Sequence, residues 1–69
     1  MRAMADNLLA GREVIFEFHP VGHLVRVSAM DTKTLTEIVI QGPKSASETL
    51  LKHNALKRLE YVLRKKGLI

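Results

Sequence analysis

Apolar and polar residues alternate from Arg12 to His19, and this period of two is typical of a strand with one buried face. The alternation stops at Pro20-Val21-Gly22-His23, because proline lacks an amide donor and glycine favours tight turns. A polar turn, Asp31-Thr32-Lys33-Thr34, interrupts the pattern again. The chain therefore predicts three strands, at residues 12–19, 24–30 and 35–41.

Two tight hairpins bring the apolar residues of these strands to one face. Closing the first hairpin about Val21-Gly22 sets Glu17 opposite Arg26, a favourable cross-strand charge pair. Closing the second about Thr32-Lys33 extends the same face to the third strand. The residues expected on this shared face are Val14, Phe16, Phe18, Val25, Val27, Ala29, Thr36, Ile38 and Ile40.

A helix is predicted over residues 46–66, where apolar residues recur with the helical period. Ser45-Ala46-Ser47-Glu48 matches a capping box, and Gly67 suits the left-handed residue that follows a helix. The predicted class is therefore α+β: a three-stranded antiparallel meander with one C-terminal helix packed on one face (βββα). The apolar arc of the helix holds Leu51, Ala55, Leu56, Leu59, Val62 and Leu63.

A chain of 69 residues forms a single domain, which we predict at residues 12–69. Residues 1–11 are expected to be a short flexible segment, or a single turn that starts at Asp6 and runs through Ala10. The chain has no cysteine, so disulfides and thiolate metal sites are excluded. Its apolar runs are too short for an export signal or a membrane span, and we expect a cytoplasmic protein.

Positive charge is concentrated in the C-terminal part of the chain. The net charge is +4, and residues 41–69 carry seven Lys or Arg against two Asp or Glu. Three interpretations stay open: a solvated helix face whose cations complement the helix dipole, a nucleic-acid site, or a surface for an acidic protein or membrane. The residues of this basic face are His53, Lys57, Arg58, Tyr61, Arg64 and Lys65.

The face of the sheet turned away from the helix is less polar than a solvated face normally is. An exposed apolar patch indicates a partner, for example a second copy of the chain. The alternatives are cover by the N-terminal segment through Leu8 and Leu9, or apolar residues scattered at the sheet's edges. The candidate interaction residues on this outer face are Ile15, Leu24, Arg26, Leu35 and Val39.

No group of residues predicts catalysis, a cofactor or a metal. His19 and His23 flank the first turn but project to opposite faces, so they do not converge on one metal ion. Glu17 and Glu37 lie on one face with Arg26 between them, as on an ordinary charged sheet surface. A non-enzymatic protein is therefore expected.

Four segments resemble a small bacterial family of uncharacterised proteins, and the resemblance covers residues 12–63. It implies no activity. The segments are Arg12-Glu13-Val14-Ile15-Phe16-Glu17-Phe18, Val25-Arg26-Val27-Ser28-Ala29-Met30-Asp31, Thr36-Glu37-Ile38-Val39-Ile40-Gln41-Gly42-Pro43 and Lys57-Arg58-Leu59-Glu60-Tyr61-Val62-Leu63.

The strand order followed by a basic helix also resembles the double-stranded-RNA-binding domain. That fold needs an N-terminal helix, which residues 1–11 are too short to supply. It also needs a basic cluster at the start of its last helix, which this sequence lacks. The leading hypothesis is therefore a protein-interaction module, homodimeric through the outer face. The alternative is a nucleic-acid-associated protein that uses the basic face.

Overall fold

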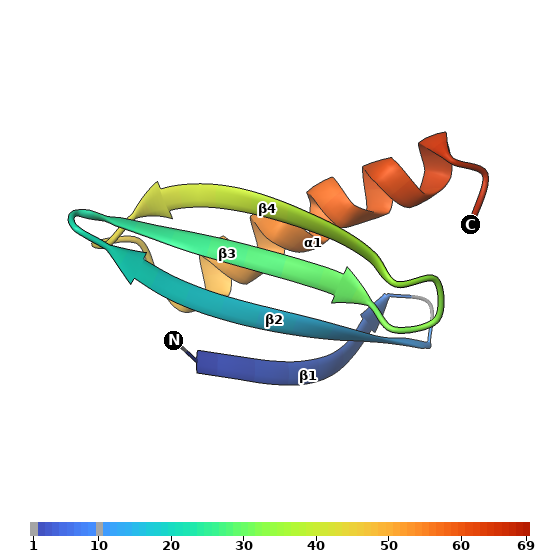
Figure 1. Ribbon diagram of the computed structural model, residues 1–69, viewed down its shortest axis with the longest axis horizontal. Coiled ribbons are helices and arrows are strands. Elements are labelled where there is room, and N and C mark those ends of the chain that lie inside the picture. Colours follow the sequence, from blue (N-terminus) through green and yellow to red (C-terminus); the bar gives the residue numbers. More distant parts are fainter. Residues whose placement is uncertain (1, 10) are drawn as a thin grey trace.

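One antiparallel sheet and one helix make up the described part of the chain (Figure 1). The computed structural model describes residues 2–9 and 11–69, and only the backbone of residues 2–9. The sheet has the strand order β1-β2-β3-β4, and α1 packs on one of its faces, so the predicted three-stranded meander and C-terminal helix are confirmed. The elements are β1 Arg2–Leu9, β2 Arg12–Val21, β3 Leu24–Asp31, β4 Thr36–Pro43 and α1 Glu48–Lys65.

β1 is a strand that the sequence did not predict. In place of a flexible segment or single turn, Arg2–Leu9 pair with β2, from Arg2 opposite Phe18 to Leu9 opposite Arg12. The segment contains no β-branched residue and no regular alternation. It therefore forms a strand because it pairs with the edge of β2, and not because its residues favour a strand. Ala10, the end of the expected turn, lies outside the described residues.

The first hairpin is shifted by two residues from the predicted register. Val21 pairs with Leu24, so the turn is Gly22-His23, and Glu17 lies opposite Ser28 instead of Arg26. Gly22 has a φ of 60°, as the first residue of a two-residue hairpin turn requires, and this requirement moves the turn along the chain. A shift of two leaves every side chain on its predicted face.

The second hairpin shows the same shift, because its loop is longer than predicted. Asp31 pairs with Thr36, and the four residues between them form the loop. Leu35, predicted to begin the third strand, lies in this loop with a φ of 60°. The Leu35 amide donates to the Asp31 carbonyl at 2.7 Å, which helps to hold this left-handed conformation.

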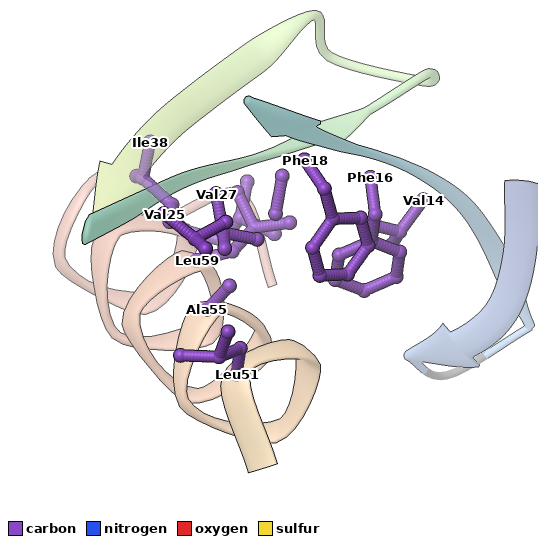
Figure 2. Packing of buried hydrophobic residues seen from close by; sticks show 11 residues of the cluster. Val14, Phe16, Phe18, Val25, Val27, Ile38, Leu51, Ala55 and Leu59 are labelled. Carbon is purple, nitrogen blue, oxygen red and sulfur yellow. The ribbon is translucent and has the colours of Figure 1, made fainter. Parts of the chain in front are cut away.

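The core lies between the sheet and α1, and it contains the residues predicted for it (Figure 2). Phe16 and Phe18 extend from β2 toward the helix, where Leu59 and Ala55 meet the sheet. Burial of these side chains provides most of the driving force for folding. The buried set is Val14, Phe16, Phe18, Val25, Val27, Ala29, Ile38, Leu51, Ala55, Leu59 and Leu63, with Ile40, Ala46, Leu56 and Val62 partly buried around it.

The helix begins two residues later than the predicted capping box. Ser47, and not Ser45, is the N-cap, and its side chain accepts a hydrogen bond from the Leu50 amide at 3.1 Å. At the other end Gly67 has a φ of 72°, as predicted. The Leu68 amide donates to the Leu63 carbonyl at 2.8 Å, which completes a Schellman motif. No helix in the described part of the chain is long and apolar enough to cross a membrane.

A buried ion pair joins Asp31, which precedes the second hairpin loop, to Arg12 at the start of β2. Arg12 also contacts the C-terminal end of the chain. Arg12 donates to Asp31 Oδ2 at 2.7 Å, and the Asp31 side chain has no exposed surface. The same oxygen accepts from the Thr34 hydroxyl at 2.7 Å, while Arg12 also donates to the Leu68 carbonyl at 2.9 Å. Burial raises the pKa of the Asp31 carboxyl, but hydrogen bonds from Thr34 and Arg12 and the charge of Arg12 hold it below its ordinary value.

Asp31→Asn is expected to lower the free energy of unfolding by about 3 kcal/mol at neutral pH, because it leaves the Arg12 charge without its partner. A carboxyl with a lowered pKa stabilises the fold above its unfolded-state value of 3.8, and this contribution is lost as the pH falls through the folded value. The difference between wild type and variant should therefore shrink in acid. Urea denaturation at several pH values measures it, with exposed Glu13→Gln as the control. A difference independent of pH would contradict the charge-pair explanation.

Candidate functional site

The face of the sheet opposite α1, called the outer face below, is left uncovered by the described chain (Figure 1). β1 pairs with β2 along its edge and approaches α1 on the inner side, so it does not fold across this face. The sequence left open that the N-terminal segment covers the outer face. The backbone of residues 2–9 does not do so, because it pairs with β2.

The five candidate interaction residues are spread over the outer side of the molecule instead of forming one patch. Leu24 is 44% exposed beside the first turn, and Val39 is 48% exposed on β4. Ile15 is half-buried on β2. Arg26 is exposed on β3, between Leu24 and the position that pairs with Val39. Leu35 is 70% exposed in the second loop, away from the strands. The apolar members are thus separated by polar residues.

A shallow depression of about 190 Å³ lies in the middle of the outer face. Its charges are mixed, with Arg26 and His19 toward one end of the strands and Glu37 toward the other. Ser28 donates weakly to Glu17 at 3.5 Å. No three His, Asp or Glu side chains of the described residues group to hold a metal ion. The lining residues are Glu17, His19, Arg26, Ser28, Glu37 and Val39.

A second hollow, of about 360 Å³, opens where the end of the sheet meets the start of α1. It has an apolar floor and two charged side chains, Lys44 and Glu48, among its lining residues. Sequence reasoning missed it because it depends on how the first turn and the helix start meet in space. The other lining residues are Phe18, Pro20, Val25, Ala46 and Leu51.

β4 forms one border of the sheet, and alternate residues turn their backbone groups to its free side. The Lys44 amide donates to the His23 carbonyl at 2.9 Å, which makes these two residues a hydrogen-bonded pair. In an antiparallel ladder such pairs alternate, so the next ones toward the N-terminus are Gly42, Ile40 and Ile38 with β3. The amides and carbonyls that point to the free edge therefore belong to Glu37, Val39 and Gln41.

The middle of this edge lacks the features that normally prevent strands from pairing. Glu37 is charged at one end, and Pro43 lacks an amide at the other. Between them runs Ile38-Val39-Ile40, which is apolar and β-branched. The edge is thus open to another strand over its central residues.

The six residues of the basic face lie on α1, and all of them are exposed. The Arg58 guanidinium lies 5.3 Å from the centre of the Tyr61 ring, and Lys65 Nζ lies 5.9 Å from it. Glu60 contacts Arg64 at 3.7 Å, in an exposed pair. These contacts engage the one aromatic ring that base stacking would use.

The comparisons with known proteins identify a family but no activity. A family model described as Domain of unknown function (DUF6898) matches residues 11–66. No curated protein and no solved structure matches the chain. The expected likeness to an uncharacterised family is thereby confirmed. Bacterial origin stays a prediction, and β1 precedes the meander where the double-stranded-RNA-binding fold has a helix.

Val39→Thr should change the free energy of unfolding by less than about 0.5 kcal/mol, because this side chain is already exposed to water. Val27→Thr, the same chemical change at a fully buried position, is expected to cost about 1–3 kcal/mol. Urea denaturation of dilute protein compares the two variants. Equal losses would show that Val39 is part of the folding core and not a free surface.

Proposed function

We propose that this chain, which belongs to the family of domains of unknown function (DUF6898) over residues 11–66, is a protein-interaction module that associates with a second copy of itself through the outer side of its sheet. The observation that carries the proposal is that this side is uncovered while it displays the half-exposed Val39 on the border strand β4. Small domains with a thin core often gain stability by oligomerisation.

The charges of the outer face support a second copy as the partner. In a two-fold contact, residue i meets residue j of the partner, and residue j meets residue i. Arg26 and Glu37 lie toward opposite ends of β3 and β4, so a two-fold axis that sets the strands of the two copies antiparallel turns the Arg26 end of one copy toward the Glu37 end of the other. A face with charges of one sign would repel its own copy.

A non-catalytic role is part of the proposal. The depression on the outer face is smaller than the roughly 300–1,000 Å³ usual for small-molecule sites, and the larger hollow of about 360 Å³ is lined mainly by apolar residues. In the depression the Ser28 hydroxyl lies 3.5 Å from Glu17, farther than the roughly 2.6–3.2 Å expected between a nucleophile and its base.

A nucleic-acid-associated protein is the second candidate function. The exposed cations Lys57, Arg58, Arg64 and Lys65 along one side of α1 favour it, since residues 57–65 of the helix rise by about 12 Å, roughly three to four phosphate steps along the axis of one strand. The pairing of Arg64 with Glu60 and the cation contacts of Tyr61 reduce what this face offers to a nucleic acid.

The mean mass of the protein should rise from the 7.8 kDa of one chain toward that of a dimer as its concentration increases from about 10 µM to about 1 mM. Sedimentation equilibrium at neutral pH and moderate salt, as in the expected cytoplasmic setting, measures this change. A strict monomer at the highest concentration would remove the proposal.

The second candidate predicts salt-dependent binding of RNA or DNA that is lost when Lys57, Arg58 and Arg64 are all replaced by alanine. Fluorescence anisotropy at about 50 and about 200 mM salt tests it, because neutralised phosphates give a steep salt dependence. Lys33→Ala, an exposed cation in the second loop, is the control. Absence of any salt-dependent affinity in the wild type would exclude this candidate.

A further inference from the structure

We infer that the second copy binds at the free edge of β4, where two β4 strands pair antiparallel about a two-fold axis that passes through Val39. This inference rests on the proposed self-association and narrows it from a whole side of the molecule to one edge. The result is a continuous sheet in which the outer faces of both copies lie side by side.

The backbone of β4 fits this register. The groups that point to the free edge belong to Glu37, Val39 and Gln41, which are centred on Val39. With the axis at Val39, each outward residue meets an outward residue of the partner, and opposed residues exchange both of their hydrogen bonds. Every outward amide and carbonyl of the three residues then has a partner.

The side chains on the outer side are complementary in the same register. Glu37 lies opposite the partner's Gln41, so a carboxylate meets an amide that can donate to it. Val39 lies opposite the partner's Val39, which buries two half-exposed apolar side chains together. On the inner side Ile38 lies opposite the partner's Ile40, a β-branched pair of the kind that stabilises sheets.

The neighbouring registers are worse for identifiable reasons. With the axis at Ile38, Gln41 lies opposite the partner's Leu35, which is in the loop. With the axis at Ile40, Glu37 lies opposite the partner's Pro43, which has no amide to donate. With the axis at Glu37, two carboxylates are directly opposed, which is destabilising. With the axis at Gln41, Val39 lies opposite the partner's Pro43, which has no amide to donate. The axis at Val39 avoids all four problems.

The helix leaves room for the added strand. Leu51 lies against Gly42 of β4, whereas Lys52 lies over the Phe16 ring of β2 at 5.3 Å, and these contacts assign the two sides of α1. Val62 follows Leu51 by about three turns and therefore faces β4. Figure 1 shows α1 passing behind β4 and extending past it, so the helix lies on the inner side of this edge and not in line with the strands. Ile40 and Val62, both partly buried, would lie under the joint.

The affinity should be modest. One strand pair with its flanking side chains buries an area at or below the lower end of specific interfaces, which is about 1,200 Å². The association is therefore expected in the micromolar to millimolar range and should depend on concentration.

Charge substitutions at the axis test the register directly. Val39→Lys or Val39→Glu alone sets like charges opposite each other, and each should weaken association by at least about 10-fold. Because residue 39 meets its own copy, a mixture of V39K and V39E should form a dimer at least as tight as that of the wild type. Sedimentation of each variant and of the mixture measures this, and failure of the mixture to associate overturns the inference.

Leu24→Lys and Leu24→Glu are the matched controls, because Leu24 is similarly exposed on the outer face but lies on β3, away from the free edge. They should leave the dissociation constant within about two-fold of the wild type. If the Leu24 variants dissociate and the Val39 variants do not, the copies stack face to face, and the edge is wrong while self-association stands. A monomeric wild type defeats both proposals.

A substitution at the end of the paired segment tests the same register from the opposite direction. Gln41→Lys sets an ammonium group opposite the partner's Glu37, where the wild type has a neutral amide. Opposite charges that face each other across a strand pair are favourable, so this variant should tighten the dimer. Sedimentation beside the wild type measures the change, and weaker association would contradict the register.

Discussion

Among the described residues, α1 is the one element that buries the apolar face shared by β2, β3 and β4, and this constraint decides both the fold and the surface that remains. The core side chains of the sheet must pack against those of α1. This requirement determines, for β2, β3 and β4 together, which side of each strand faces the helix. With one helix available, the described chain covers one side of the sheet and leaves the other side to solvent or to a partner. The thin core and the uncovered face therefore come from the same limit on size.

The alternation of residues predicted the faces correctly although both hairpin registers were wrong. A shift of two residues keeps each side chain on its face, so the pattern alone could not distinguish the registers. Gly22 decided the first, because its positive φ is needed at the first turn position. β1 had no comparable signal in the sequence. Its residues include none that is β-branched, and the segment forms a strand because it pairs with β2.

Long-range contacts were also beyond the sequence pattern. Arg12 contacts both Asp31 and the Leu68 carbonyl, a combination that no local rule connects. The candidate site was predicted in part: Leu24, Arg26 and Val39 are exposed on the outer face, but Leu35 lies in a loop because the second hairpin is longer. The free edge of β4 depends on strand order and hydrogen-bond parity, and only the folded sheet supplies both.

Amide hydrogen exchange of β4 at two protein concentrations tests most directly whether this edge is the contact between copies. The amides of Ile38 and Ile40 face β3 and should be protected at both concentrations. Those of Glu37, Val39 and Gln41 should exchange rapidly in dilute protein and become protected as the concentration rises. Protection of these three amides that does not change with concentration, or that never appears although the protein associates, would contradict pairing at β4.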